Sequence, residues 1–395
     1  MTPPSEADDR RAPVPVVHVI TKLELGGAQQ NTLHTVANLD RARFAPVLVT
    51  GPGGLLEEEA RSLEDVPLHI LDDLRRPISP GRDLAASRAL RSLLETVAAG
   101  GPCVVHTHSS KAGIVGRWAA CRAEVGPVVH SIHGFGHDAI RSGLKRWVAL
   151  TLERTMARHT DAFISVSRAN AEQGLDLGLI DDTPVHIIRS GIDVEDFARA
   201  DALRAATRAE LGYDDDTPVV GMIACLKPQK APADFVAACV QVAESLPAAR
   251  FFIAGDGELR GEVEALIAAN ELGDRVQLLG WRRDVPALLG ALDVHVLSSR
   301  WEGLPRVAPQ TMAAGRPMVA TAVDGTPEAI VHERNGFLVQ PGDVDGLAQH
   351  TLTLLRDTEL RARFAAAGRE AVSEFHQDVM VAQQEALYDA LLAER

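Results

Sequence analysis

The chain has 395 residues and a formal net charge of −14, and its composition is 46% hydrophobic and 24% charged. This length and composition predict a globular protein of two domains. The acidic balance opposes the basic surface that nucleic-acid binding requires, so we exclude nucleic acid as a partner. No apolar run reaches the ~18 residues of a membrane span. Four cysteines without a CxxC pair indicate reduced thiols and a cytoplasmic protein.

The N-terminal segment, residues 1–13, is Pro-rich and charged, and it has no apolar core of a signal peptide. We expect it to be a disordered lead-in.

Short apolar runs that are typical of β-strands then alternate with helical patterns. In the N-terminal half the expected strands are residues 14–20, 45–50, 66–71, 103–108, 127–133 and 161–167, with a helical pattern at 26–39 after the first. In the C-terminal half they are residues 218–225, 249–256, 275–280, 293–299 and 317–323. This alternation predicts an α/β protein with parallel sheets and crossover helices. Roughly twelve strands exceed one typical sheet, so we place a domain boundary at the start of the polar, acidic segment 189–218.

Glycine-bearing loops follow several of these strands. Gly26 and Gly27 follow the first strand, Asp256 and Gly257 follow the strand at 249–256, and Gly303 follows the strand at 293–299. Ligands of open α/β sheets bind at the carboxyl ends of strands, often on such loops and on helix N-termini. The loops therefore favour a phosphate-containing ligand, although each glycine by itself is also compatible with a simple tight turn.

Two lysines, Lys227 and Lys230, follow the first strand of the C-terminal half in "ACLKPQKAP". Their ammonium groups suit a diphosphate; the alternative is an ordinary exposed lysine pair. The stretch "GDGELRG" (255–261) lacks the third glycine of a dinucleotide fingerprint, which argues against a nicotinamide enzyme.

Five histidines lie close together in the first half: His106, His108, His130, His133 and His137. His106 and His108 share one face of a strand and are a candidate metal pair. No third ligand stands at a recognisable metal spacing, so we expect no metal. A single cleft histidine that hydrogen-bonds or transfers a proton is the better hypothesis, and His133 in "SIHGFGH" fits it. The DxD spacing in "GDVDG" is interpreted as a helix cap at Asp343, not as a metal site.

Residues 141–161 form a helical pattern with basic residues on one side and Trp147 among apolar residues. A basic amphipathic helix can lie on an anionic membrane. It can equally be an ordinary packed helix with a solvated face.

The chain resembles the retaining GT-B glycosyltransferases of family four, a group with many bacterial cell-surface polysaccharide enzymes. The matching stretches cover nearly the whole chain in family order: "GGAQQNTLHTVANL", "HTHSSKAGIVGRWAA", "HGFGH", "SVSRANAE", "SGIDVEDF", "GMIACLKPQKAPADFV", "FFIAGDGELRGEVEAL", "RVQLLGWRRDVPALLGALDVHVLSSRWEGLPRVAPQTMAAGRPMVATAVDGTPEAIV" and "NGFLVQPGD".

This resemblance implies two Rossmann-like domains that face a cleft. Residues 14–188 would receive the acceptor, residues 189–374 would bind a nucleotide-diphospho sugar, and a last helix at 375–395 would cross back to the N-terminal domain.

The resemblance also implies roles for individual residues. His133 corresponds to the histidine near the reacting sugar, Lys230 to the diphosphate lysine, and Glu302 to the first glutamate of a paired-glutamate motif. The remaining donor-binding candidates, by motif position, are Gly26, Gly27, Lys227, Asp256, Gly257, Trp281, Gly303, Leu304 and Gln310. We expect a helix to start near Gly303, with Pro305 in its first turn and Gln310 two turns on.

Three positions depart from the family pattern. Cys225 stands where an arginine is frequent, so Lys227 is the expected replacement cation. Gln310 replaces the second glutamate of the pair, and Ser190 replaces the asparagine of an "NGID" stretch.

The expected reaction is sugar transfer from a UDP- or GDP-type donor to a saccharide or lipid-linked saccharide, without a metal or other cofactor. The expected location is the cytoplasm, at the inner face of the plasma membrane if the 141–161 helix touches lipid. A nucleotide-sugar 2-epimerase, which needs no acceptor, and a non-catalytic nucleotide-sugar or glycan-binding module are the alternatives.

Overall fold

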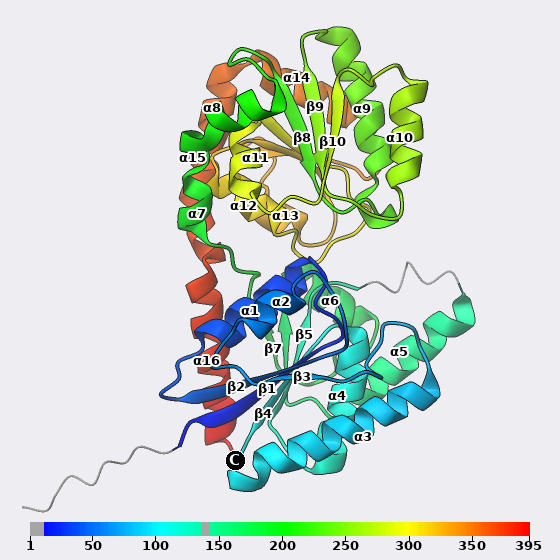
Figure 1. Ribbon diagram of the computed structural model, residues 1–395, viewed down its shortest axis with the longest axis vertical. Helices are drawn as coiled ribbons and strands as arrows, with labels where there is room; N and C mark the ends of the chain where they lie inside the picture. Colours follow the sequence, from blue (N-terminus) through cyan, green and yellow to red (C-terminus); the bar gives the residue numbers. More distant parts are fainter. Residues whose placement is uncertain (1–11, 136–141) are drawn as a thin grey trace, which may run out of the picture. The chain divides into compact units, whose positions relative to one another are not determined.

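A computed structural model of the chain describes residues 12–135 and 142–395, which fold into two compact units (Figure 1). Unit 1 contains the chain up to Ser165 together with 174–186 and 381–395, and unit 2 contains 166–173 and 187–380. The predicted domains 14–188 and 189–374 differ from these units mainly because residues 166–173 join unit 2. Most of the predicted lead-in, and His137 and Arg141, lie outside the described residues.

Unit 1 is built on a seven-stranded sheet of order β3-β2-β1-β4-β5-β6-β7. Neighbouring strands from β3 through β6 pair in parallel. The strands are β1 (Val14–Ile20), β2 (Phe44–Thr50), β3 (Leu68–Ile70), β4 (Val104–His108), β5 (Val128–Ile132), β6 (Ala162–Ser165) and β7 (Val185–Ile187). The helices are α1 (Gly27–Asn38), α2 (Glu57–Arg61), α3 (Pro80–Val97), α4 (Ser110–Ala123) and α5 (Gly143–Ala157), with a 3-10 turn, η1, at Ala98–Gly100.

Alternate side chains of the central strands of unit 1 enter two separate apolar layers. Val17 and Val19 pack with α3 and α4, whereas Ile20 packs with α1 and α2 on the other face. Because parallel strands are covered by helices on both faces, their sequences are nearly continuous apolar runs. This burial explains why the sequence predicted them.

Unit 2 is built on a six-stranded, all-parallel sheet of order β10-β9-β8-β11-β12-β13. Its strands are β8 (Val219–Ile223), β9 (Arg250–Ala254), β10 (Val276–Gly280), β11 (Val294–Leu297), β12 (Met318–Thr321) and β13 (Gly336–Val339). Its helices are α7 (Val194–Ala198), α8 (Ala200–Leu211), α9 (Pro232–Ser245), α10 (Arg260–Ala269), α11 (Val285–Ala291), α12 (Val307–Ala313), α13 (Thr326–Ala329), α14 (Val344–Arg356) and α15 (Thr358–Ala371), with 3-10 turns η3 (Pro228–Lys230) and η4 (Val372–Phe375). Phe251 and Phe252 enter opposite apolar layers of this sheet.

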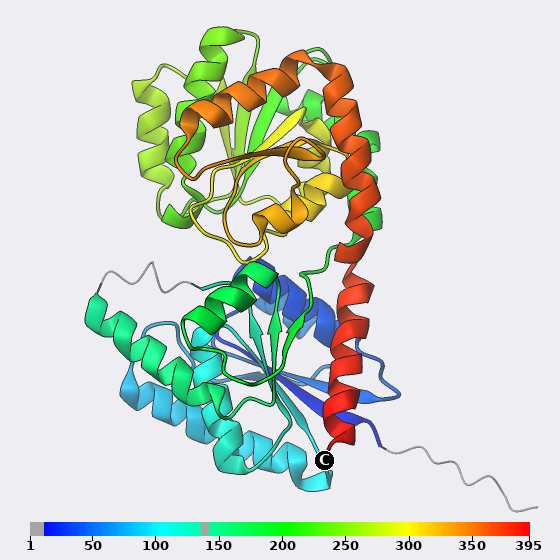
Figure 2. The same ribbon diagram turned by 180° about the vertical axis from the view of Figure 1, so that it is seen from behind.

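Two helices belong partly to each unit. Helix α6 (Arg168–Asp176) begins in unit 2 and ends in unit 1. Helix α16 (Gln377–Ala393) begins in unit 2, and its residues from Val381 onward belong to unit 1, as the predicted last helix at 375–395 would require (Figure 2). No helix among the described residues combines the length and apolar character needed to cross a membrane.

The polar segment 189–218, predicted to hold the boundary, is mostly part of unit 2. Helices α7 and α8 form there, and α8 is anchored by the fully buried Arg208. The Arg208 guanidinium donates to the carboxylate of Asp293 at 3.0 Å, and Arg204 and the Val219 N–H donate to the same carboxylate at 2.7 and 2.8 Å. Arg208 also donates to the carbonyl oxygens of Asp214, Asp215, Thr217 and Ala291. One guanidinium therefore joins α8 to the starts of β8 and β11.

Replacing this guanidinium tests the anchor. Arg208→Ala leaves the Asp293 carboxylate and four carbonyl groups short of a donor, so we expect unit 2 to lose about 3–5 kcal/mol of unfolding free energy in urea denaturation. The control is Arg199→Ala, because exposed Arg199 pairs with Asp196 at the surface, and its loss should cost within about 0.5 kcal/mol. Equal unfolding midpoints for the two variants would contradict the assignment.

Candidate functional site

The six-stranded sheet of unit 2 has its topological switch point between β8 and β11. From β8 the chain proceeds outward through β9 to β10, and it then returns to the other side of β8 with β11. The loops after β8 and β11 diverge at this point, which is where open α/β sheets bind their ligands. Lys227 and Lys230 lie on the loop after β8, and Glu302 to Leu304 lie on the loop after β11.

Glu302 is at the centre of a hydrogen-bonded cluster at this switch point. Its side chain pairs with the Lys230 ammonium group, and the Ser299 hydroxyl donates to the same carboxylate oxygen, Oε1, at 2.6 Å. The Gln229 amide donates to the other oxygen, Oε2, at 3.4 Å. The Glu302 N–H donates to the Asp324 carboxylate at 2.5 Å. Glu302 is only 5% exposed, so its position depends on these partners.

Lys230 and Glu302, which the sequence presented as separate candidates, are therefore one ion pair. An ammonium group has three donors. Glu302 is the one partner of the Lys230 side chain within residues 12–135 and 142–395, and that side chain remains 15% exposed. Lys230 thus retains donor capacity for an anion beside Glu302.

Lys227 lies on the same loop, directly before η3. Its side chain is half-buried and forms no ion pair or hydrogen bond with any residue of 12–135 or 142–395. It is the second ammonium group that the sequence predicts near the phosphates, and it has no partner within the described part of the chain.

The loop after β9 is packed tightly against the loop after β8. The Leu226 N–H donates to the Asp256 carbonyl at 3.0 Å, and a Cβ on Gly257 would lie 2.4 Å from the Leu226 carbonyl oxygen. Glycine at 257 is therefore required by the close approach of two backbones. The Asp256 carboxylate accepts the Gly257 N–H at 2.8 Å and pairs with Arg260 at 3.1 Å, so it stabilises its own loop.

Trp281 follows β10 at the same edge of the sheet and is 45% exposed. Strand β10 lies two strand positions from β8, which corresponds to about 10 Å. The structure thus places Trp281 on the correct edge but not beside Lys230 and Glu302.

The expected helix start at Gly303 is wrong, because α12 begins at Val307. Leu304 precedes Pro305, and a residue before proline is disfavoured in helical conformation. The Gly303 carbonyl instead accepts the Gly325 N–H at 3.0 Å. Gly303 and Leu304 therefore lie in a bend before the helix, and their N–H groups donate to none of the described residues.

Gln310 lies in the first turns of α12, where its N–H donates to the Arg306 carbonyl at 3.2 Å. The prediction that Gln310 lies two turns into a helix that starts near Gly303 is wrong, since Gly303 is outside the helix. The side chain is half-buried, and its amide has no partner within the described part of the chain.

The seven-stranded sheet of unit 1 has its own switch point between β1 and β4. Helix α1 starts there at Gly27, with Gly26 as its N-cap, and no side chain caps it and no acidic residue lies in its first turn. Uncapped N–H groups at a helix start suit an anion. The backbone of Gly26 is extended, with φ −158°, so this conformation alone does not require glycine.

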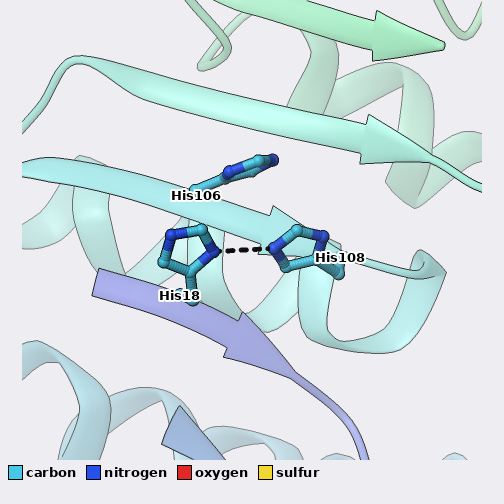
Figure 3. Close-up of side chains that lie close together, drawn as sticks. All are labelled: His18, His106 and His108. Atoms are coloured by element: carbon cyan, nitrogen blue, oxygen red, sulfur yellow. Dashed lines mark hydrogen bonds between the residues drawn. The ribbon is translucent and has the colours of Figure 1, made fainter. Parts of the chain in front are cut away.

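Strands β1 and β4 and the loop after β5 bring together four histidines, three of which are drawn in Figure 3. His18 Nδ1 lies 3.1 Å from His108 Nε2, and His108 Nδ1 lies 3.2 Å from His133 Nε2. His106 lies against this row with its ring centroid 4.1 Å from that of His108. Sequence analysis did not single out His18; the available signal was its place on β1, in register with His106 on β4.

Nitrogens of His18, His106 and His108 lie within 4.8 Å of one another, which is close enough to consider a metal site. The ligand lone pair of an imidazole lies in the plane of its ring. Both nitrogens of His106 are hydrogen-bonded, to the Tyr388 hydroxyl at 2.6 Å and to the Ser131 hydroxyl at 2.7 Å. The ring of His106 also lies over that of His108, so its lone pair does not point to a centre shared with the other two.

Burial sets the protonation of these histidines. It lowers the pKa of His18 to about 3 and that of His133 to about 4, and it lowers the pKa values of His106 and His108 well below the usual 6.5. All four are therefore neutral at pH 7. His133 lines a small pocket with Ser109, Ser110, Gly134 and Phe135, among other residues.

Both halves of the chain match known protein families. The family described as glycosyl transferase 4-like domain matches residues 26–191, and the family described as glycosyl transferases group 1 matches residues 204–371. The UDP-Gal:alpha-D-GlcNAc-diphosphoundecaprenol alpha-1,3-galactosyltransferase of Escherichia coli is 30% identical over 367 residues, which cover 92% of this chain and 93% of that relative. The lipopolysaccharide core biosynthesis glycosyltransferase LpsE of Rhizobium meliloti is 30% identical over 236 residues, covering 60% and 64%.

Among solved structures, Anabaena HepE in complex with UDP matches with a TM-score of 0.80 at 22% identity, covering 96% of this chain and 100% of that chain. The lipopolysaccharide-biosynthesis glycosyltransferase WaaG matches with a TM-score of 0.75 at 16% identity, covering 94% and 99%. Two parallel-sheet Rossmann-like units of this kind are the GT-B fold. The chain belongs to family four of the GT-B glycosyltransferases, which confirms the resemblance found in its sequence motifs.

Proposed function

We propose that the protein transfers a sugar from a nucleotide-diphospho sugar, of the UDP or GDP type, to a saccharide or lipid-linked saccharide, with retention of the anomeric configuration. The observation that carries the proposal is the Lys230–Glu302 pair at the switch point of unit 2. The name of the E. coli relative supports it, since that enzyme uses UDP-galactose and a diphosphoundecaprenol-linked sugar. We further propose a role in cell-surface polysaccharide or glycoconjugate synthesis.

Departure of the nucleotide diphosphate requires stabilisation of the negative charge that develops on it. Lys230 retains donor capacity beside Glu302, Lys227 is uncommitted, and the N–H groups of Gly303 and Leu304 are available. Preorganised donors of this kind contribute about 3 kcal/mol each to transition-state stabilisation in other enzymes. Two ammonium groups neutralise much of a diphosphate, so the proposed reaction needs no divalent metal or other cofactor.

Glu302 and Gln310 would hold the two ends of the donor. Among the described residues, the Glu302 oxygen Oε2 has only the long 3.4 Å contact from Gln229, so it can accept a hydrogen bond from a sugar hydroxyl. The free amide of Gln310 can bond a ribose hydroxyl, without the charge of the glutamate that is typical at this position. Retention would proceed on one face of the sugar, with the departing phosphate taking the acceptor proton and His133 positioning the sugar.

Helix α5 supports a peripheral membrane contact of unit 1, at the inner face of the plasma membrane. Leu144 and Trp147 are 73% and 61% exposed, and Val148 and Leu152 continue the same apolar stripe along the helix. Lys145 and Arg158 are exposed near its two ends. An apolar stripe flanked by cations suits an anionic lipid surface, where a lipid-linked acceptor would be found.

The direct test is a thermal-shift panel of UDP, GDP and ADP sugars, followed by transfer assays with the donor that stabilises the protein most. Transfer to a diphosphoundecaprenol-linked sugar, with retained configuration and in the presence of EDTA, is the expected result. Conversion of the donor to its 2-epimer without any acceptor would instead show a nucleotide-sugar epimerase.

Removal of Lys230 should abolish turnover. We expect Lys230→Ala to lower kcat by about 100-fold or more, because a charged donor to the leaving diphosphate is lost. Lys230→Ala also leaves Glu302 buried without its cation, so the double variant Lys230→Ala/Glu302→Gln, which removes both charges, should be equally inactive while folding normally. Arg91→Ala is the control, since Arg91 also pairs with a carboxylate, that of Glu95, on α3 and lines no part of the pocket that contains His133. A folded, fully active Lys230→Ala enzyme would refute the role.

Removal of the Gln310 amide should weaken nucleotide binding more than it slows the reaction. One lost hydrogen bond corresponds to about 1 kcal/mol, so we expect the Kd for UDP or GDP to rise about fivefold in Gln310→Ala. Titration calorimetry measures this directly. The same Kd in the variant and the wild type would count against a ribose contact.

Removal of the apolar stripe should detach the protein from lipid. We expect Leu144→Ser/Trp147→Ser to lose cosedimentation with phosphatidylglycerol vesicles and to retain transfer to a water-soluble acceptor. The matched control is Leu55→Ser/Trp118→Ser, which removes one leucine and one tryptophan that are also exposed in unit 1 but lie off α5. Equal vesicle binding by both double variants would show that α5 is not the lipid contact.

A further inference from the structure

Three imidazoles in unit 1 form a hydrogen-bonded row that ends at a pocket. The row runs from His18 through His108 to His133, with nitrogen–nitrogen distances of 3.1 and 3.2 Å. The dashed line in Figure 3 marks its inner link, between β1 and β4. His18 is fully buried, and His133 lines the pocket at the outer end.

The protons of this row are interdependent. A neutral imidazole has one N–H and one lone pair, so a ring that donates through one nitrogen accepts through the other. Burial lowers the pKa values of all three histidines, which keeps them neutral. His108 uses both nitrogens in the row, so its two hydrogen bonds must run in the same direction. Only two arrangements are possible: His18 donates toward His133, or His133 donates toward His18.

The buried end of the row distinguishes these arrangements. His18 Nε2 is buried and has no hydrogen-bond partner among the described residues. If His133 donates toward His18, this nitrogen carries a proton and is an N–H donor without an acceptor. If His18 donates toward His133, this nitrogen carries an unshared lone pair. Orphaned buried N–H groups are the rarer of the two in native structures, so donation from His18 toward His133 is favoured.

We propose that His18 and His108 are positioning residues that hold His133 as the tautomer with its proton on Nδ1. In this arrangement His18 Nδ1–H donates to His108 Nε2, and His108 Nδ1–H donates to His133 Nε2. His133 Nδ1 has no partner in the described chain and is left as a donor. Given the proposed sugar transfer, His133 binds an oxygen of the bound saccharide or phosphate as a hydrogen-bond donor, and it has no free lone pair with which to act as a base.

The hydrogen bonds of the neighbouring histidines do not impose the opposite direction of donation on the row. His106 packs against His108 with its ring tilted by 34°, but it directs its own two nitrogens to Tyr388 and Ser131. The Tyr388 hydroxyl donates to the Gln384 side-chain oxygen at 3.3 Å, so His106 Nδ1–H donates to Tyr388 and His106 Nε2 accepts from Ser131. His130 bonds Thr107 at 2.8 Å instead of the row. The protons of these neighbours are therefore assigned separately from those of the row.

Nitrogen NMR of the full-length, ligand-free protein tests the proposal, and it does so whether or not the proposed reaction is correct. Two-bond proton–nitrogen correlation of 15N-histidine protein distinguishes a protonated from a bare ring nitrogen, and the His133→Gln spectrum assigns the His133 signals. We expect a protonated Nδ1 and a bare Nε2 for His133 at pH 7. Protonation at Nε2, the form that histidine prefers in water, would overturn the proposal.

Two glutamine variants distinguish an effect of the histidine row on His133 from a general effect of altered packing. In His108→Gln the side-chain amide can face His133 with either its donor or its acceptor, so the His133 signals should move toward an average of the two tautomers. In His130→Gln, a matched control at a buried histidine on the neighbouring strand, they should stay as in the wild type. Unchanged His133 signals in His108→Gln would overturn the proposal, and if that variant does not fold, the wild-type tautomer alone decides.

Discussion

The ion pair between Lys230 and Glu302 is the interaction on which the site of unit 2 depends. It joins the loops that diverge from β8 and β11, and further bonds hold the same two loops together. The Arg300 N–H donates to the Gln229 carbonyl at 2.7 Å, and the Ser298 hydroxyl contacts the carbonyls of Lys230 and Ala231 at 3.0 Å. A buried charge pair is stable only when its remaining donors and acceptors are satisfied. The pair and these bonds therefore hold the two loops together at the switch point.

Much of the fold was predictable because buried parallel strands have a strong sequence signal. Each predicted strand overlaps one strand of the structure, and the missed strands are β7 and β13. Both are short and lie at the edge of a sheet, where β7 is partly exposed. An edge strand is covered less completely, so its residues need not be continuously apolar. The composition of segment 189–218 predicts a polar boundary. Its helices are instead held by charged groups such as Arg208, and composition alone does not distinguish such helices from a solvated loop.

The sequence locates the candidate residues of the site but not the bonds between them. Position after a strand predicts Lys227 and Lys230, because strand ends meet at one edge of a parallel sheet, and the family resemblance adds Glu302. The pairing of Lys230 with Glu302 depends on which strands are neighbours, and so does the partnership of His18 with His108. Neither follows from spacing along the chain. Glycine after a strand predicts a helix start near Gly303. Pro305 disfavours a helical conformation at Leu304, so α12 begins later, at Val307.

The division of α16 between the units has a consequence for synthesis. Unit 1 is discontinuous, and its last part, from Val381 onward, is made after all of unit 2. That part supplies Tyr388, which bonds His106, and Glu385, whose carboxylate accepts the Asp40 N–H at 2.7 Å. Domains fold in the order in which a ribosome releases them when each is continuous. Here the unit that begins first is completed only after unit 2 has been synthesised, so its histidine cluster gains the Tyr388 contact late.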